Sequence, residues 1–453
     1  VILAAGKGTR MQSELPKVLH HLAGMPMLGH VINTGNSLSP ERMIIVAGHG
    51  AQAVDNFAKD LNKNVETVLQ PEQLGTGHAV DQARKTLADF HGNIIIIYGD
   101  TPLLKSSTLA NLSASLSKAD LSVLGFETET PDRYGRLVVD NDNLKRIIEF
   151  KDASKSEKAI KLCNSGVMSI SRTLLFELLT KINNQNASGE FYLTDIVEIM
   201  KKDHIVGTFV LWDNKKVMGI NDLYSVSIAE KYLRDLINKD HMLNGVSIIN
   251  PETVTIGHDV EIEPGVTIYP NTYITGGSVI KTGSKIGPNT EIHTSTVHEN
   301  VIVKHSLVFD SEIYDNTTIG PFAHLRNHAI IGPNNRVGNF VEVKNSTTGK
   351  GTKASHLAYI GDSTTGKNVN FGCGSITVNY DGVNKHRTII GDDVFIGCNT
   401  NLVAPIEIGD NVFIAAGSTV TKNVPKGAMA IARNRQINKE DYTKNLIRPK
   451  SDT

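Results

Sequence analysis

The chain has 453 residues, more than one hydrophobic core usually supports, so at least two domains are expected. Its 46 Lys and Arg residues almost balance its 47 Asp and Glu residues. Charge therefore gives no reason to expect binding to nucleic acid or to an anionic membrane, and no apolar run is long enough to span one. The three cysteines form neither a disulfide framework nor a zinc-binding spacing, which favours the reducing cytoplasm. Val1 already lies in an apolar strand, so we expect a few residues to precede it.

The first predicted strand runs into a glycine-rich loop. Gly6 and Gly8 are followed by two cations, Arg10 and Lys17. Glycines let backbone N–H groups approach an anion and cations balance its charge, so the pattern predicts a phosphate-binding loop. It is not a P-loop, because no Lys-Ser/Thr follows a glycine at the required spacing, nor a dinucleotide fingerprint, because Met11 occupies the third glycine position. An ordinary glycine-rich turn is the alternative.

The first half of the chain alternates strands and helices. Apolar runs at 43–47, 65–69, 94–98 and 121–126 are separated by segments such as 51–61 and 77–87. This alternation predicts a Rossmann-like α/β domain, a mostly parallel sheet covered by helices on both faces. Ligands of such sheets bind at the carboxyl ends of the strands, where the glycine-rich loop and Asp100 both fall.

A helical arm and a change of period follow. Asp222 can cap a helix, and apolar residues continue at helical spacing to 243. From Ile256 the chain takes a period of six, which neither a helix nor an ordinary strand produces. This period predicts a left-handed parallel β-helix of hexapeptide repeats. The inward positions are Ile256, Ile262, Ile268, Ile274, Ile280, Ile286, Ile292, then Ile319, Leu325, Ile331, Val337, Val343, then Ile390, Ile396, Leu402, Ile408, Ile414 and Val420.

The period of six is lost between Gly349 and Arg387. Residues 379–387 are predicted to form a loop extruded from the coil, and solenoids place such insertions on their binding face. His356 also lies in this interval. An isolated histidine on a solenoid edge is more often a turn residue, but one near a binding face can act as a general base.

The motifs recur in the order of a known family. The glycine-rich loop with Leu15-Pro16-Lys17 resembles the signature of sugar-nucleotide pyrophosphorylases. Further motifs are Gln73 to Ala79 (QLGTGHA), Tyr134-Gly135-Arg136, Glu149 to Asp152 (EFKD), Asn164-Ser165-Gly166 and Glu190 to Asp195 (EFYLTD). Nearly the whole chain resembles the bacterial bifunctional N-acetylglucosamine-1-phosphate uridylyltransferases and glucosamine-1-phosphate acetyltransferases. The resemblance implies synthesis of UDP-N-acetylglucosamine, a precursor of peptidoglycan and lipopolysaccharide.

For the first domain the resemblance implies a site for UTP, the sugar phosphate and Mg²⁺. Because the sugar phosphate brings its own nucleophilic oxygen, positioning and charge neutralisation should dominate catalysis. The implied contacts are Leu3, Ala4 and Gly6 with uridine, Gln70, Gly75 and Thr76 with uracil, Arg10 and Lys17 with phosphates, Gly135, Glu149, Asn164 and Thr194 with the sugar, and Asp100 and Asn221 with Mg²⁺.

For the β-helix the resemblance implies an acetyltransferase whose base is His356. It also implies a homotrimer through the β-helix, with acetyl-CoA between subunits. The implied contacts are Arg326, Lys344 and Lys385 with the phosphate of glucosamine-1-phosphate, Tyr359 and Asn370 with its sugar, and Cys373, Asn379, Tyr380, Cys398, Ala416 and Arg433 with acetyl-CoA.

The chain departs from the family pattern at four positions. His324 and Asn327 replace an arginine and a proline, and Cys373 and Cys398 stand where alanine and serine are more usual. We hypothesise that alkylation of the two thiols inhibits acetyl transfer selectively. The expected boundaries are a uridylyltransferase domain at 1–221, a helical arm at 222–244, the β-helix at 245–436 and a tail at 437–453.

Two rival interpretations remain open at this stage. The β-helix could serve only for oligomerisation or regulation, as in several pyrophosphorylases. Alternatively, the chain could be a sugar-nucleotide sensor without catalysis.

Overall fold

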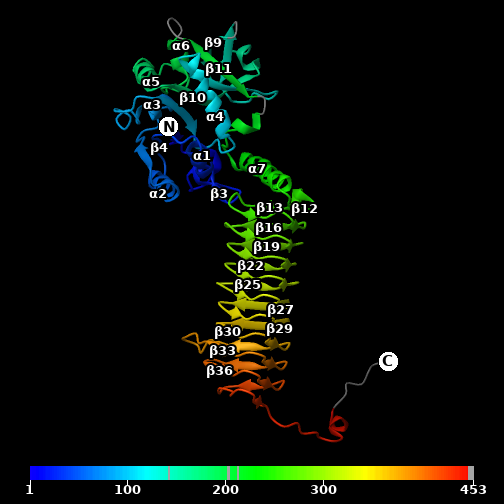
Figure 1. Ribbon diagram of the computed structural model, residues 1–453. Coiled ribbons are helices and arrows are strands. Elements are labelled where there is room, and N and C mark those ends of the chain that lie inside the picture. The colour runs from blue at the N-terminus through cyan, green and yellow to red at the C-terminus, as the bar shows by residue number, and fades with distance from the viewer. Residues whose placement is uncertain (141–142, 201–204, 212–213, 447–453) are drawn as a thin grey trace. The chain divides into compact units, whose positions relative to one another are not determined.

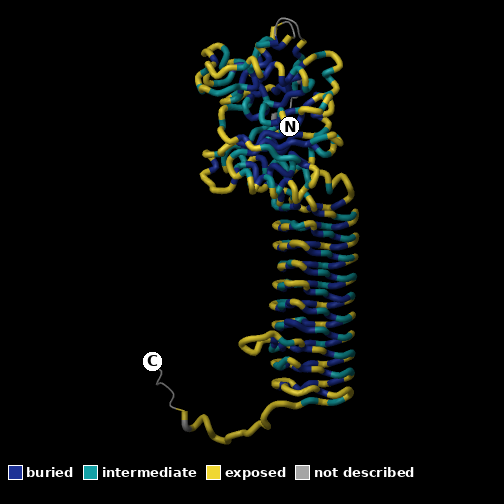
Figure 2. Tube along the Cα trace, turned by 90° about the vertical axis from the view of Figure 1, so that its left-hand side faces the viewer, coloured by how far each residue is buried: buried dark blue, intermediate teal, exposed yellow. Residues whose placement is uncertain are grey.

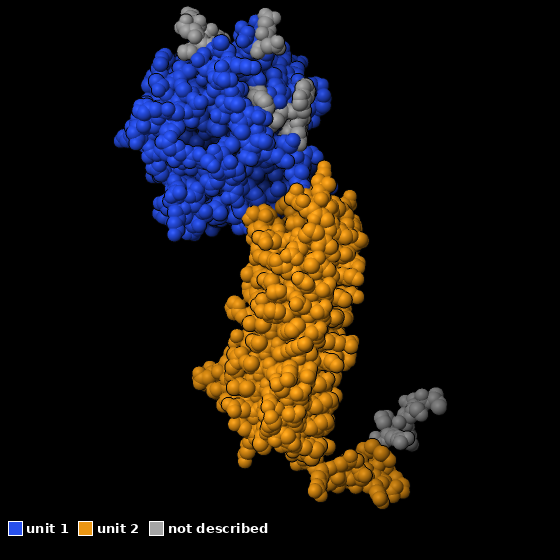
Figure 3. Space-filling view, in the orientation of Figure 1, with its two compact units in different colours: residues 1–236 blue, residues 237–453 orange. Residues whose placement is uncertain are grey.

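The computed structural model describes residues 1–140, 143–200, 205–211 and 214–446. The chain divides into two compact units, Val1–Leu236 and Ile237–Thr453 (Figure 3). The final part of the predicted tail, from 447 on, lies outside the described residues.

The first unit is built on a mixed sheet (Figure 1). Its strand order is β11-β7-β10-β6-β1-β4-β5. All neighbours in this order pair in parallel except β10, which is antiparallel to β6 and β7. An antiparallel hairpin of β8 and β9 extends from β10. The strands are β1 (Ile2–Ala4), β4 (Met43–Ala47), β5 (Val65–Leu69), β6 (Asn93–Tyr98), β7 (Leu121–Glu127), β8 (Arg136–Asp140), β9 (Asn143–Ile148), β10 (Leu162–Ser171) and β11 (Val206–Leu211).

Two hydrophobic cores cover the two faces of this sheet. Along β1, Ile2 and Ala4 belong to one core and Leu3 to the other, because successive side chains of a strand point to opposite faces. The predicted Rossmann-like class is therefore confirmed. The helices are α1 (Met27–Asn36), α2 (Ala51–Leu61), α3 (Thr76–Asp81), α4 (Ser106–Ala114), α5 (Arg172–Leu179) and α6 (Asp195–Ile199).

The predicted bounds of the helices and strands agree with the structure, with one exception. β4, β5 and α2 have the predicted bounds. The helix predicted at 77–87 was too long, because α3 ends at Asp81. Beyond it the backbone tightens into turns in which Gln82, Ala83 and Arg84 each donate to the carbonyl three residues earlier.

The predicted arm is helix α7 (Leu223–Leu243). Its start is capped by Asp222, whose Oδ1 accepts from the Ser225 backbone N–H at 2.8 Å. Ala229 is buried in the first unit, whereas Ile237 packs against the core of the second. The division between the two units therefore falls within α7, after Leu236.

The second unit is a β-helix of short parallel strands from β12 (Ser247–Ile248) to β39 (Met429–Ala430) (Figure 1). In-register pairs stack coil on coil, as with Ile256 on Ile274 and Ile274 on Ile292. One continuous hydrophobic core, mostly of isoleucine and valine, fills the interior. The predicted β-helix is confirmed.

The coil also continues where the period of six is lost. Ile292 pairs with Val308, only 16 positions later, so coils between 293 and 318 have shorter turns. Between 349 and 387 the inward positions include Thr365 and Thr377, both buried. The Thr377 hydroxyl donates to the Gly361 carbonyl at 3.0 Å, so a hydroxyl fits the interior there.

The extruded loop at 379–387 leaves the coil between β32 (Ile376–Val378) and β33 (Thr388–Ile390), as predicted. Figure 2 shows it projecting from the coils as a largely exposed segment. Asp381 orders it by accepting from the backbone N–H groups of Val383 and Asn384 at 2.8 and 2.6 Å. At its base the His386 N–H donates to the Asn379 carbonyl at 2.8 Å.

Candidate active sites

A cleft of about 300 Å³ lies at the carboxyl ends of β1, β5 and β6. This is the position expected for a ligand of such a sheet. Gly6 leaves open space, since nothing lies within 4 Å of where its Cβ would stand. The sequence-predicted residues that line the cleft are Leu3, Ala4, Gly6, Lys17, Gln70, Gly75, Thr76 and Asp100.

The proposed uracil contacts are held by the segment that precedes α6. Buried Gln70 donates from Nε2 to the Gly75 carbonyl at 3.1 Å, and Thr76 Oγ1 accepts from the Leu193 N–H at 3.0 Å. Gly75 has φ of 114°, and a Cβ there would stand 2.5 Å from the Phe191 carbonyl oxygen. Only glycine fits this close approach, which fixes the loop against residues 190–193.

Lys17 joins the two predicted metal ligands. Its Nζ forms an ion pair with Asp100 and donates to Asn221 Oδ1 at 3.2 Å. A carboxylate and an amide oxygen thus face the same cation position, and hard oxygen donors of this kind fit Mg²⁺. Among the described residues no group of three or more His, Cys, Asp or Glu side chains could hold a metal. The remaining ligands would have to come from phosphates or water.

Arg10 lies exposed on the turn Thr9–Met11, while Lys17 is partly buried at the start of Lys17–Leu19. Gly8, which directly precedes the turn that carries Arg10, packs against Lys17. Its φ is 61°, and a Cβ there would stand 2.6 Å from Lys17 Cβ. Gly8 therefore lets the loop turn closely over Lys17.

The proposed sugar residues form a second group that does not line the 300 Å³ cleft. Thr194 Oγ1 donates to Glu149 Oε1 at 3.3 Å, and the Asn164 N–H donates to the Gly135 carbonyl at 2.8 Å. A Cβ on Gly135 would stand 3.5 Å from Glu149 Oε1. Burial raises the pKa of Glu149.

Tyr98 was not predicted as a site residue, although it lies between the cleft and the group of proposed sugar residues around Glu149. Tyr98 lines the cleft, and burial together with the charges of Glu149 and Asp100 raises its pKa. Its position at the end of β6, two residues before Asp100, was the available signal.

Arg136, in the Tyr134-Gly135-Arg136 motif, is a large, fully buried side chain. Its guanidinium donates to the carbonyls of Asp132 and Lys158, at 3.0 and 3.2 Å from Nη2, and to that of Tyr134. These bonds fix the loop that carries Gly135.

On the β-helix, His356 lies exposed on β29 (Lys353–Gly361). Its Nδ1 lies 2.7 Å from Oδ1 of Asn339, its in-register neighbour on β27 (Arg336–Lys344). Because an amide oxygen can only accept, the neutral form of the ring that fits this contact has its proton on Nδ1 and a lone pair on Nε2. Asn339 was not anticipated, because its relation to His356 depends on the register.

Three cations gather at the carboxyl end of β29, where Lys344 pairs in register with Gly361 and with Arg326. Arg326 pairs with Glu342 at 2.6 Å, and buried Lys344 pairs with Asp362 at 3.4 Å. The pKa of Lys385 is lowered because Lys344 lies beside it, with a smaller effect of Arg326. Cations placed this close together suit a phosphate group.

Tyr359 and Asn379 also meet here, with Asn379 Nδ2 3.4 Å from Tyr359 Oη. Tyr380 is exposed and donates to the Gly382 carbonyl at 2.6 Å within the extruded loop. Asn370, on β31 (Asn370–Phe371), pairs in register with Lys353 rather than with His356 or Tyr359. Register therefore places it apart from the other acceptor residues.

Four of the six proposed cofactor residues, Cys373, Cys398, Ala416 and Arg433, form a column along one corner of the β-helix, whereas Asn379 and Tyr380 belong to the extruded loop. Cys373 and Cys398 are exposed, and the pairs Phe371–Ile396 and Ile376–Asn401 set them in register on successive coils. A Cβ on Gly397 would stand 2.5 Å from the Ala416 nitrogen, and Arg433 Cδ lies 3.5 Å from the Cβ position of Gly417.

The family departures change this region locally. Asn327 has φ of 52°, which proline cannot adopt, and its Oδ1 accepts from Arg326 Nη1 at 3.2 Å. The ring of His324 packs edge-on against Phe309, with centroids 5.9 Å apart.

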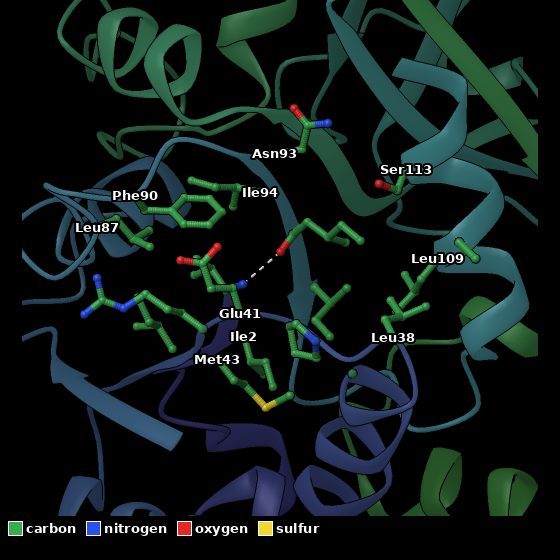
Figure 4. Close-up of a pocket in the computed structure, with 18 of the residues that line it drawn as sticks. Ile2, Leu38, Glu41, Met43, Leu87, Phe90, Asn93, Ile94, Leu109 and Ser113 are labelled. Atoms are coloured by element: carbon green, nitrogen blue, oxygen red, sulfur yellow. Dashed lines mark hydrogen bonds between the residues drawn. The ribbon is translucent and has the colours of Figure 1, made fainter. Parts of the chain in front are cut away.

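A larger cavity of about 550 Å³ lies at the amino ends of the strands, away from the predicted site. Ile2, Met43 and Ile94 line it, with Leu38, Phe90 and Leu109 (Figure 4). No residue of either predicted site takes part in it. Over the described residues, no helix combines the length and hydrophobicity that crossing a membrane requires.

Comparisons with known proteins agree with both halves of the structure. Residues 1–185 match the MobA-like NTP transferase domain. Residues 310–345 and 387–422 match the bacterial transferase hexapeptide (six repeats). The fold and these matches define a two-part transferase, with a nucleotidyltransferase unit followed by a hexapeptide-repeat transferase unit.

Full-length relatives narrow this class. The Bifunctional protein GlmU of Acholeplasma laidlawii is 55% identical over 453 residues, covering 99% of this chain and 98% of that protein. Those of Exiguobacterium sibiricum and Streptococcus mutans are each 46% identical, covering 98% of this chain and 99% and 97% of those proteins. The chain belongs to the family of bifunctional GlmU proteins. It is an enzyme of UDP-N-acetylglucosamine synthesis with uridylyltransferase and acetyltransferase activities.

Proposed function

We propose that the two reactions use two separate sites, the cleft of the first unit and the face of the β-helix around His356. The observation that carries this proposal is that the chemistry-bearing side chains form two groups, each inside one unit. One group suits a triphosphate and the other an amino-sugar phosphate.

UTP would lie in the cleft along Gly6, Gln70 and Thr76, and the sugar phosphate would lie outside the cleft, near Glu149 and Asn164. Asp100 and Asn221 would hold Mg²⁺, which neutralises charge on the triphosphate. Lys17 would then be free to bind a phosphate oxygen, as Arg10 would from its exposed turn. No side-chain base is needed, because the sugar phosphate oxygen attacks the α-phosphorus directly and pyrophosphate leaves.

On the β-helix, His356 Nε2 would take the proton of the glucosamine amine as the nitrogen attacks the thioester of acetyl-CoA. Asn339 would hold the ring in the tautomer that this step requires. Arg326, Lys344 and Lys385 would bind the acceptor phosphate, which places the amine. Tyr359 would orient the sugar from beside these cations, and Asn370 would contact it from its separate position opposite Lys353. Coenzyme A would follow the column from Cys373 and Cys398 to Ala416 and Arg433.

The β-helix would associate as a homotrimer with acetyl-CoA between subunits. Support comes from three successive corners that carry Phe322, Phe340 and Leu357 in the left-handed conformation, with φ of 59°, 58° and 39°. These large apolar side chains are exposed by 57%, 60% and 56%, and the two phenyl rings stack 5.6 Å apart. Such residues rarely adopt this conformation, and an apolar column invites a partner surface.

We also propose the domain boundaries: the uridylyltransferase domain at 1–221, the helical arm at 222–244, the β-helix at 245–436 and the tail at 437–453. A cytoplasmic location fits the three free cysteines among the described residues and the nucleotide substrates.

One assay tests this function against its rivals. Supplying glucosamine-1-phosphate, acetyl-CoA, UTP and magnesium should release coenzyme A thiol and pyrophosphate. If thiol release did not depend on glucosamine-1-phosphate, the β-helix would not be an acetyltransferase of this sugar and would serve only for oligomerisation or regulation. If UTP and N-acetylglucosamine-1-phosphate gave no pyrophosphate, the result would favour the rival interpretation of a sugar-nucleotide sensor without catalysis.

A further inference from the structure

Asp362 is a buried carboxylate at the corner that follows β29. It is 6% exposed and has φ of 49°, in the left-handed region. Its backbone N–H donates to the Lys344 carbonyl at 3.0 Å, and its carbonyl accepts from the Thr388 N–H at 3.1 Å. Asp362 therefore lies between the strand that carries Lys344 and the strand that resumes after the extruded loop.

Its side chain joins the same two regions. Oδ2 accepts from Lys344 Nζ at 3.4 Å and from the amide of Asn379, the first residue of the extruded loop. Oδ1 accepts from the amide of Asn345. Asn379 also lies 3.4 Å from the Tyr359 hydroxyl. One carboxylate thus connects a lysine, the loop base and, through Asn379, a tyrosine.

The charges around Asp362 show why a carboxylate is needed there. Lys344 on β27 has Lys385 of the loop beside it, and Arg326 of β25 (His324–Arg326) adds a third positive charge. Glu342 pairs with Arg326, so Asp362 is the carboxylate that faces Lys344. Although burial disfavours its charge, hydrogen bonds from Asn345 and Asn379 and the charge of Lys344 lower the pKa of Asp362.

We propose that Asp362 is a positioning residue for acetyl transfer. It holds Lys344 and Asn379 in place, so that the phosphate-binding cations and the base of the extruded loop are aligned before the acceptor binds. This role rests on the proposed function, because it assigns the acceptor phosphate to Arg326, Lys344 and Lys385. Its consequence is that the negative charge, rather than the space it fills, supports phosphate binding.

The informative substitution is Asp362→Asn. Asparagine adopts the left-handed conformation as readily as aspartate, and it keeps the volume of the side chain. Asn345 can turn its own amide to meet the new NH₂ group, so the main loss is the charge that faces Lys344. Asp310→Asn is the matched control, since Asp310 is an exposed left-handed corner residue with φ of 45°.

Asp362→Asn should raise the KM for glucosamine-1-phosphate about ten-fold, the scale of one charge-assisted hydrogen bond, with a smaller change in kcat. It should weaken competitive inhibition by inorganic phosphate to a similar degree. The alkaline limb of kcat/KM should move to lower pH, because the carboxylate of Asp362 favours the protonated forms of Lys344 and Lys385, and both lysines lose a proton more readily without it. Uridylyl transfer should stay at the wild-type rate, as should both reactions of Asp310→Asn.

Two results would overturn the role. One is an unchanged KM and pH profile, and the other is a fall in kcat with unchanged inhibition by phosphate, which would indicate a purely structural effect. Lys344→Met separates this failure from failure of the proposed function. If that variant also binds acceptor and phosphate normally, the phosphate assignment itself is wrong.

Discussion

The most specific prediction for the first site concerns Asp100. Its carboxylate forms an ion pair with Lys17, and the two side chains are only 16% and 13% exposed. Asp100→Ala removes the one charged member of the proposed metal pair and leaves Lys17 with the neutral amide of Asn221. We expect the uridylyl rate to fall about 10²–10³-fold, comparable to losing one preorganised group that stabilises charge, or about 2.7–4 kcal/mol.

The assay is pyrophosphate release across a magnesium series. Asp100→Ala should need more magnesium for half-maximal rate, and Asn221→Ala should shift the series in the same direction. Acetyl transfer by the same preparation should be unchanged, because it takes place in the other unit. Asp60→Ala, at an exposed position of α2, controls for general loss of charge. A full rate with unchanged magnesium dependence would remove Asp100 from the metal site.

Three further predictions test other parts of the structure. In a Cys163→Ser background, N-ethylmaleimide should abolish acetyl transfer but not uridylyl transfer, since Cys373 and Cys398 are exposed; lack of protection by acetyl-CoA would contradict the cofactor column. Phe340→Asp should convert the trimer to monomers in sedimentation and stop acetyl transfer alone, because it charges the apolar column; an intact trimer would place the interface elsewhere. Burial raises the pKa of Asp195 to about 6, so the folded first unit holds this proton more tightly than the unfolded chain. The stabilisation of the folded state by this proton is present in full below about pH 4 and is lost as pH rises through 6. Asp195→Asn should therefore raise the urea midpoint at pH 8 more than at pH 4, and an equal shift at both would rule out this titration.

The sequence predicted the fold wherever one physical signal dominated. The isoleucines from Ile256 to Ile292 mark the β-helix because every inward position is aliphatic. The period of six is harder to recognise where Thr365 and Thr377 point inward. Threonine is not read as a hydrophobic residue, although its hydroxyl can bond to the backbone inside the coil, as that of Thr377 does. The period is also harder to recognise after Ile292, where shorter turns change the spacing although the stacking persists.

The candidate sites were predictable as motifs but not as contacts. Motifs named Asp100, Asn221 and Lys17 separately, whereas their convergence depends on strands and loops 83 and 204 residues apart. Asn339 and Asp362 escaped notice for the same reason. Their roles depend on register between coils, and register follows from turn lengths that sequence spacing does not give.

The central claim is that one chain carries two independent reactions, and His356→Ala tests it most directly when both activities are measured on the same preparation. Loss of the base should lower acetyl transfer about 10²–10⁴-fold. Uridylyl transfer should remain within about two-fold of the wild-type rate, because His356 belongs to the β-helix alone. A parallel fall of both activities in a folded protein would contradict the account.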